Sequence, residues 1–210
     1  MLLFIAISLV GCTDSGSDFL KTGFESGRYR TVVVFGDSIV QGYQQPEGWP
    51  EILGRELVAR FPGVSIANAG VSGDTAARGL ARLERDVLSL QPDLVLISFG
   101  LNDMKNREPV DRFAGAMNGI IAKLEETGSS VVLLTTTRLQ RGTGMVARFS
   151  PDEYNDAIGK IARERGFLLI DVYNEFKGFN TPEYLMDVAH PNLLGYKKVS
   201  GIVLEGLVGE

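Results

Sequence analysis

The sequence predicts an α/β fold, a three-layer α/β/α sandwich built around a five-stranded parallel sheet. Two observations support this prediction. From residue 30 onward, short β-branched runs alternate with longer amphipathic stretches, which is the pattern of repeated βα units. The runs are also apolar almost throughout, as is typical of strands that are buried on both faces of a sheet.

Five apolar runs are the candidate strands, and turn-forming or polar residues bound them. They cover residues 31–36 (TVVVFG), 64–70 (VSIANAG), 93–100 (DLVLISFG), 130–137 (SVVLLTTT) and 167–172 (FLLIDV).

Between these runs, apolar residues recur at spacings of three and four, which places each set on one face of a helix. The sets are Ala76, Leu80, Leu83, Val87 and Leu90, then Val110, Phe113, Met117, Ile120 and Leu124. A third helix is predicted to start at an N-cap Ser150, because Pro151 and Glu153 follow at the positions of a helix-start signature. Its apolar stripe is Tyr154, Ile158 and Ile161, and a last amphipathic stretch follows Asn192.

The N-terminus predicts a processing signal. Residues 2–10 form an apolar run, which is too short for a membrane span of about 20 residues. With Gly11 and Cys12 it resembles a bacterial lipoprotein signal, in which Leu9-Val10-Gly11-Cys12 is the lipobox and Cys12 becomes lipidated. A cut-short secretory signal or a frayed apolar tail is the alternative.

The resemblance implies three parts of the chain. Residues 1–11 would be the signal peptide, and residues 12–29 would be the lipidated cysteine with a flexible polar tether. Residues 30–210 would form one globular domain. The expected location is extracytoplasmic, with the protein held on a bacterial membrane by its N-terminal lipid.

Composition excludes several classes of function. The net charge of −5 and the pI near 5.1 give no electrostatic basis for binding nucleic acid. One cysteine and one histidine cannot form an intramolecular disulfide or a zinc site of nitrogen and sulfur ligands. Sites for Mg²⁺ or Ca²⁺ made of carboxylates alone are not excluded by composition, but neither an EF-hand spacing nor a P-loop is present, and no metal site is predicted.

Polar, glycine-containing features follow the first three predicted strands. They are Gly36-Asp37-Ser38, Asn68-Ala69-Gly70 and Gly100-Leu101-Asn102-Asp103. Because ligands bind at the carboxyl ends of parallel strands, we expect these features to line one crevice.

The only histidine of the chain, His190, lies in the stretch DVAHPN and predicts a catalytic base. Ser38 follows a glycine in a strand-to-loop turn, where its hydroxyl can be exposed, and it becomes a nucleophile when a base accepts its proton. Asp187, three residues before His190, could hold the other ring nitrogen. The backbone N–H groups of Ser38 and Gly70 and the side-chain amide of Asn102 are candidate donors to an oxyanion.

Four motifs in this order resemble the signature blocks of the SGNH, or GDSL-type, esterase and lipase family. They are FGDSIVQGY around Ser38, NAGVSGDT around Gly70, GLND around Asn102 and DVAHP around His190. The resemblance implies a flavodoxin-like fold and a catalytic triad of Ser38, His190 and Asp187. It also implies an oxyanion hole of Ser38, Gly70 and Asn102.

The expected function is hydrolysis of carboxylic esters through an acyl-enzyme, as in the small lysophospholipase, arylesterase and thioesterase members of that family. The substrate would be a small acyl ester, and no cofactor is needed. A carbohydrate O-deacetylase and an acyl-thioesterase are alternatives within the enzyme class. A non-catalytic surface lipoprotein that binds glycan or lipid is the alternative from another class.

Other residues have structural interpretations. Trp49 is predicted to be a core residue, and Asp37, Asp74 and Asp103 are predicted to cap helices or brace turns. Arg138, Arg141 and Arg148 are placed in the long loop after the fourth strand, as a solvated basic loop or as contacts to an anionic head group.

Overall fold

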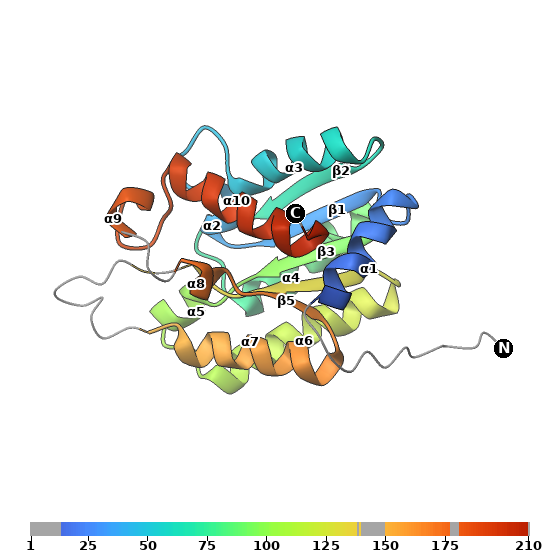
Figure 1. The fold of residues 1–210 in the computed structure, drawn as a ribbon. Coiled ribbons are helices and arrows are strands. Elements are labelled where there is room, and N and C mark those ends of the chain that lie inside the picture. The colour runs from blue at the N-terminus through green and yellow to red at the C-terminus, as the bar shows by residue number, and fades with distance from the viewer. Residues whose placement is uncertain (1–13, 138, 140–149, 177–180, 210) are drawn as a thin grey trace.

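A parallel β-sheet runs through the centre of the molecule (Figure 1). The computed structural model describes residues 14–137, 139, 150–176 and 181–209, and within these ranges five strands follow the order β2-β1-β3-β4-β5. They are β1 (Thr31–Gly36), β2 (Ser65–Gly70), β3 (Leu94–Ser98), β4 (Ser130–Leu134) and β5 (Leu168–Ile170). All neighbouring strand pairs are parallel, so the carboxyl ends of the strands lie on the same side of the sheet. The predicted α/β class is confirmed.

The long helices form a layer on each face of the sheet (Figure 1). One layer is α1 (Asp14–Glu25), α3 (Trp49–Arg60) and α10 (Leu193–Val208); the other is α4 (Ala76–Asp86), α6 (Val110–Glu126) and α7 (Asp152–Arg165). The short elements are α2 (Ser38–Gln41), the 3-10 turn η1 (Leu88–Leu90), α5 (Leu101–Lys105), α8 (Val172–Glu175) and α9 (Thr181–Tyr184).

Burial follows the position of each strand in the sheet. The central strands β1 and β3 are almost fully buried, as their continuous apolar runs predict. The edge strand β2 is half-buried or exposed along its length, which its run did not predict. The strand β4 ends before the predicted Thr137, because the N–H of Thr136 donates to Asn155 Oδ1 instead of to a neighbouring strand.

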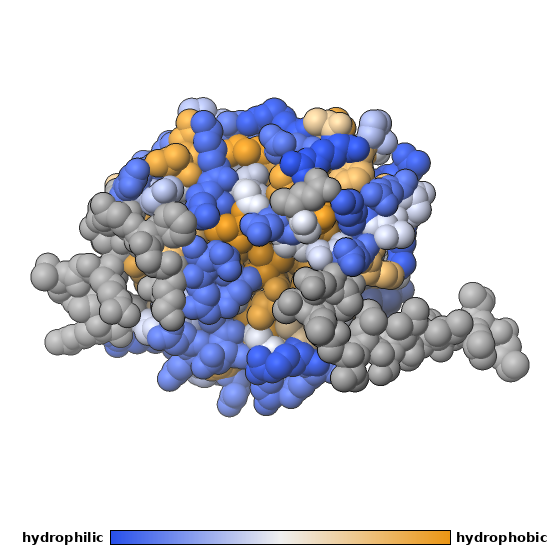
Figure 2. Space-filling view, viewed as in Figure 1, coloured by the Kyte–Doolittle hydropathy of each residue, from blue (hydrophilic) through white to orange (hydrophobic). Residues whose placement is uncertain are grey.

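The amphipathic stripes form the two core layers on either side of the sheet. Phe113, Met117, Ile120 and Leu124 of α6 are buried, and the outward faces of α6 and α7 are hydrophilic (Figure 2). Trp49 is 1% exposed at the start of α3, which confirms its core assignment. Leu90 is 45% exposed, because α4 ends at Asp86 and the 3-10 turn that follows changes the helical period.

The start of α7 differs from the prediction by one residue. Pro151, not Ser150, is the N-cap, and Asp152 is the first helical residue. The Ser150 hydroxyl donates to the Asp152 carboxylate, so the serine still lies at the start of this helix.

The predicted flexible tether over residues 12–29 contains a helix instead. Leu20 and Phe24 lie four residues apart on α1, are buried, and pack this helix against the domain next to α10. The Phe24 ring stacks on Phe61 at 5.2 Å between centroids and meets Tyr29 edge-on. This apolar spacing outweighs the polar Gly/Ser composition at the start of the segment.

Several predicted features lie outside the described residues, namely the apolar N-terminal run with Cys12 and the three arginines Arg138, Arg141 and Arg148. Among the residues that are described, no helix combines the length and apolarity that crossing a bilayer requires.

Candidate active site

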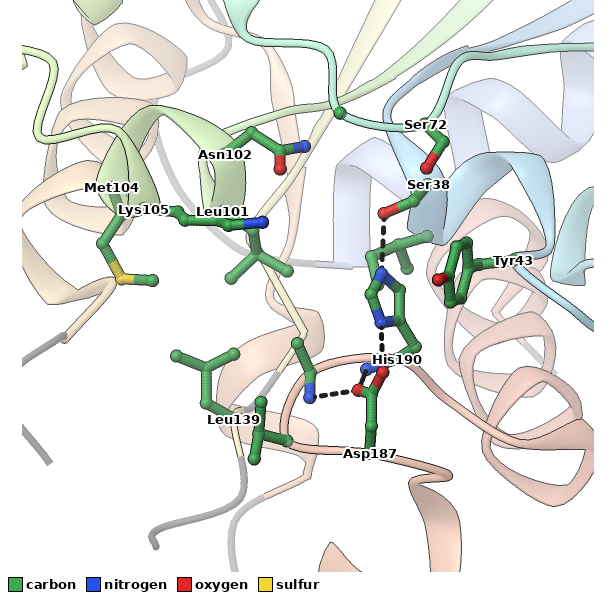
Figure 3. Close-up of a pocket in the computed structure, with 14 residues that line it drawn as sticks. Ser38, Tyr43, Ser72, Leu101, Asn102, Met104, Lys105, Leu139, Asp187 and His190 are labelled. Atoms are coloured by element: carbon green, nitrogen blue, oxygen red, sulfur yellow. Dashed lines mark hydrogen bonds and ion pairs between the residues drawn. The ribbon is translucent and has the colours of Figure 1, made fainter. Parts of the chain in front are cut away.

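Ser38 lies at the carboxyl end of the central strand β1, as the first residue of α2. Gly36 makes the turn possible, since a Cβ at this position would lie 2.4 Å from the Ser98 carbonyl oxygen. Asp37 caps α2 by accepting the N–H of Ile39 at 2.9 Å, which confirms its predicted capping role. The Ser38 side chain therefore projects from the end of the sheet into a pocket (Figure 3).

The loop before α10 brings His190 to Ser38 across 152 positions of sequence. His190 Nε2 lies 3.0 Å from Ser38 Oγ, and His190 Nδ1 lies 2.7 Å from Asp187 Oδ2 (Figure 3). A bridge between Leu185 and Pro191 closes the base of this loop, and the N–H of Met186 donates to the His190 carbonyl oxygen. The three predicted triad side chains thus form one chain of polar contacts.

Asp187 is suited to accept the imidazole N–H. Burial alone would raise the pKa of this carboxyl. However, the backbone N–H groups of His190 and Ala189 donate hydrogen bonds to Oδ1, at 2.7 and 2.8 Å, and the imidazole lies beside Oδ2. Together these contacts outweigh the effect of burial, so the pKa of Asp187 lies below its usual value. Near neutral pH the carboxylate is therefore ionised, and its hydrogen bonds fix its orientation.

Asn102 lies on the opposite wall of the pocket from His190 (Figure 3). It follows β3 on the short helix α5, after Gly100, whose φ of +129° is a glycine conformation. Its side-chain nitrogen donates to the Asp74 carbonyl oxygen at 3.0 Å and makes a longer contact with Asp37 Oδ2 at 3.3 Å. The amide is therefore held with its NH₂ on the side of Asp37 and Ser38.

Gly70 does not occupy the position that the sequence predicts for an oxyanion donor. Its N–H donates to Asn68 Oδ1 at 2.9 Å, and a Cβ on Gly70 would lie 2.3 Å from the Gln41 nitrogen. Gly70 therefore packs against the end of α2 and does not line the pocket.

Gly73, three residues later in the same motif, does line the pocket. It has a φ of +82°, and a Cβ there would meet nothing within 4 Å, so this residue faces open space. Its N–H donates to no acceptor within the described ranges. The prediction missed it because the direction of an N–H group depends on the loop conformation and not on the spacing of glycines.

Buried aspartates brace the loops around the site. Asp103 accepts the N–H of Ala76 with both oxygens and so fixes the start of α4. Burial raises the pKa of Asp103 to about 6. Burial raises the pKa of Asp37 to about 7, and the carboxylates of Asp103 and Asp74 act in the same direction.

Arg82 is a buried cation that the sequence interpretation overlooked. Its guanidinium pairs with Asp74 at 2.5 Å and donates to the carbonyl oxygens of Gly36 and Ala69, each at 2.9 Å. It also lies over the Phe35 ring at 4.6 Å. Arg82 thereby joins the ends of β1 and β2 to the loop that carries Gly73. One signal for its burial was available in the sequence. Arg82 lies three residues after Gly79 and beside the apolar residues that were predicted to face the core from this helix.

The pocket around Ser38 has a volume of about 470 Å³. Its walls differ in chemistry (Figure 3). Apolar side chains form most of the lining, namely Ile39, Leu101, Met104, Leu139 and Val188, with Lys105 among them. Tyr43, Ser72 and Gly73 line the side next to Ser38 and His190. Over the described ranges, no three His, Cys, Asp or Glu side chains gather as a metal site would require.

Comparison with protein families gives a match over most of this domain. The model of the GDSL-like lipase/acylhydrolase family matches residues 34–198. The matched range contains Ser38, Gly73, Asn102, Asp187 and His190.

Three curated relatives are similar along most of their length. An arylesterase of Vibrio mimicus is 31% identical, with 84% of this chain and 88% of that protein covered. An acetylxylan esterase of Geobacillus stearothermophilus is 27% identical, with 81% and 90% covered. A Bacillus subtilis protein named as an uncharacterized lipoprotein is 27% identical, with 75% and 76% covered.

A solved structure shares the fold. The lipase/acylhydrolase from Enterococcus faecalis is 27% identical and superposes with a TM-score of 0.74, covering 86% of this chain and 96% of that one.

Proposed function

Because this chain belongs to the GDSL-like lipase/acylhydrolase family, we propose that Ser38, His190 and Asp187 are the residues that carry out its ester hydrolysis. The chain is a carboxylic ester hydrolase of this family. The observation that supports the residue assignment is the continuous contact from Ser38 Oγ through His190 to Asp187, at 3.0 and 2.7 Å.

The proposed reaction begins with attack of Ser38 Oγ on the acyl carbonyl carbon while His190 Nε2 accepts the hydroxyl proton. The imidazolium then donates this proton to the alcohol oxygen as its bond to the acyl carbon breaks, which leaves an acyl ester on Ser38. Water attacks the acyl carbon in the same way, and His190 returns its proton to Ser38 as the acid leaves. Asp187 keeps the ring in the required tautomer and stabilises the imidazolium.

We propose that the oxyanion is held by the N–H groups of Ser38 and Gly73 and by the Asn102 amide. Gly73 replaces Gly70 in this role, because the Gly70 N–H already has a partner and Gly73 lines the pocket. The 3.3 Å contact from Asn102 to Asp37 is the weaker of its two contacts. A substrate oxygen would replace that contact in the transition state.

The apolar wall favours an acyl chain longer than acetyl. Each methylene that leaves water for this wall contributes about 0.8 kcal/mol, or about fourfold in kcat/KM. We therefore expect kcat/KM to rise from p-nitrophenyl acetate through butyrate to octanoate. A maximum at acetate would instead favour the carbohydrate O-deacetylase, and faster cleavage of an octanoyl thioester than of the matched oxygen ester would favour the acyl-thioesterase.

The nucleophile is tested by the same substrates with a Ser38→Ala variant. Removing the hydroxyl should lower kcat on the order of 10³-fold or more, with the melting temperature retained as the check on folding. Covalent labelling by a fluorophosphonate should occur in the wild type and not in the variant. An unlabelled, folded wild type that turns over no ester would leave the non-catalytic glycan- or lipid-binding lipoprotein as the better interpretation.

We further propose that Cys12 carries the lipid of an extracytoplasmic, membrane-anchored protein. The apolar run ending in Gly11-Cys12 and the relative named as a lipoprotein support this proposal. The full chain produced in bacteria with labelled palmitate should incorporate the label and sediment with membranes. Incorporation that persists in a Cys12→Ala variant would exclude Cys12 as the lipidation site.

A further inference from the structure

A tyrosine ring covers one face of the catalytic imidazole. The rings of Tyr43 and His190 stack with centroids 4.0 Å apart and planes 25° apart (Figure 3). We propose that Tyr43 is a positioning residue for His190, which keeps the imidazole in line between Ser38 and Asp187 and stabilises its protonated form. This inference rests on the proposed role of His190 as the base.

The nucleophile's own helix holds Tyr43 in place. The Tyr43 N–H donates to the carbonyl oxygen of Ser38 at 3.1 Å, directly after Gly42, which ends α2 with a φ of +84°. A Cβ on Gly42 would lie 2.7 Å from Gly48, so the turn packs tightly against the following segment. These contacts fix the position of Tyr43 relative to Ser38.

The loop that carries His190 needs such a contact. The imidazole contacts Ser38 and Asp187 through its two ring nitrogens, whose N–H bond and lone pair point outward in the plane of the ring. In-plane bonds resist sliding of the ring but oppose tilting only weakly, whereas a packed aromatic face resists tilting directly. A contact from Gln45 Nε2 to Met186 Sδ at 3.3 Å holds the same turn and the same loop together.

The stack also has an electrostatic effect on the reaction. When Ser38 transfers its proton, the imidazole becomes a cation whose face is presented to the electron-rich face of Tyr43. Such a contact is stronger in the protonated intermediate than in the resting enzyme. It therefore favours the transition state over the ground state, and we expect it to raise kcat rather than to lower KM.

The tyrosine hydroxyl has a separate environment. It accepts a hydrogen bond from Gln44 Nε2 at 3.1 Å on the exposed side of the turn. The ring, and not the hydroxyl, faces the imidazole, so a phenylalanine should perform the same role.

The test compares Tyr43→Leu, Tyr43→Met and Tyr43→Phe in the full chain. The two aliphatic variants should lower kcat, and the rate of fluorophosphonate labelling of Ser38, by roughly 10-fold with KM nearly unchanged. Tyr43→Phe should restore both rates. Equal losses in Tyr43→Phe and Tyr43→Leu would overturn the ring-stacking role, as would full activity in the aliphatic variants.

The single histidine provides an independent measurement of the stack. The imidazole proton resonances belong to His190 alone, so they can be assigned without further variants. They should be shifted upfield by the Tyr43 ring current in the wild type and in Tyr43→Phe, and this shift should be lost in Tyr43→Leu and Tyr43→Met. An unshifted wild-type signal would overturn the proposal.

These readouts separate the inference from the proposed function. The ring-current shift needs neither substrate nor an active nucleophile, and it should persist in Ser38→Ala. Ester turnover that survives Ser38→Ala would remove the proposed triad while leaving the stack in place.

Discussion

At the scale of single residues, the side chain of Asn102 contacts two segments that surround the pocket and is also a proposed donor to the oxyanion. Its NH₂ group is engaged by Asp74 and Asp37, at 3.0 and 3.3 Å. In the proposed role, a donor held in this way would reach the developing oxyanion without a search through rotamers, and it carries no charge that would bind the product acid. The amide is thus oriented before the substrate arrives.

Replacing Asn102 with alanine should lower kcat about 10²-fold and leave KM within a few-fold, because the lost hydrogen bond strengthens only in the transition state. Steady-state kinetics on p-nitrophenyl butyrate measures both constants, and the melting temperature reports whether the pocket survives. A variant with wild-type kcat would assign the oxyanion to other donors.

The sequence motifs predicted the side chains that the structure brings together at the pocket. Ser38 and Asn102 each follow a strand, and His190 is the single histidine of the chain, with Asp187 three residues before it. The proposed backbone donor could not be predicted. Gly70 and Gly73 have the same side chain, and only the conformation of the loop shows that the N–H of Gly70 already has a partner. Tyr43 belongs to the motif FGDSIVQGY, but its stacking on His190 depends on two segments that meet only in the folded structure.

At the scale of elements, Arg82 stabilises the loop between β2 and α4. The pair with Asp74 is about nine-tenths buried on both sides. The guanidinium also donates to the carbonyl oxygens at the ends of β1 and β2, and to Asp86 at 3.3 Å. Breaking such a pair from one side leaves a buried charge without compensation.

Arg82→Met should therefore destabilise the protein by about 3–5 kcal/mol and also lower kcat, because Gly73 and the carbonyl that orients Asn102 belong to the same loop. Arg85→Ala is the matched control. That arginine pairs with Asp86 at the surface, where solvent screens the pair, so its loss should leave stability nearly unchanged. Urea unfolding of both variants gives the comparison, and similar losses in the two would show that the buried pair has no special role.

The strands were easier to predict than the helix ends and the N-terminal segment. Buried parallel strands have continuous apolar runs, which sequence shows directly. The start of α7 depends on which backbone N–H groups the cap accepts, and α1 depends on apolar partners elsewhere in the chain, such as Phe61. Residues 14–25 contain two glycines and two serines, and that composition concealed the pair Leu20 and Phe24.

At the scale of the whole molecule, two buried carboxyls are expected to make the folded state less stable as the pH rises. Burial raises the pKa of Asp37 to about 7 and that of Asp103 to about 6, so the folded state binds their protons more tightly than the unfolded chain. Their stabilising contribution is fully present below the pKa of the unfolded carboxyl and is lost as the pH passes through 6 to 7.

The free energy of unfolding should thus decrease between pH 5 and pH 8, on the order of a few kcal/mol. Urea unfolding measured across a series of buffers tests this trend. Asp103→Asn should reduce the slope of the stability curve. Stability that is flat or increases over this range would contradict the assignment of raised pKa values.

The position of His190 in the chain has a consequence for protein synthesis. Ser38, Gly73 and Asn102 all precede the fourth strand, whereas the proposed base and α10 follow the fifth. If Ser38 and His190 act as proposed, a nascent chain that ends before residue 187 has the nucleophile without its base. Such a chain also lacks α10, the last described helix, which packs next to α1. A ribosome-bound or prematurely terminated product lacking residues 187–208 should therefore not hydrolyse esters.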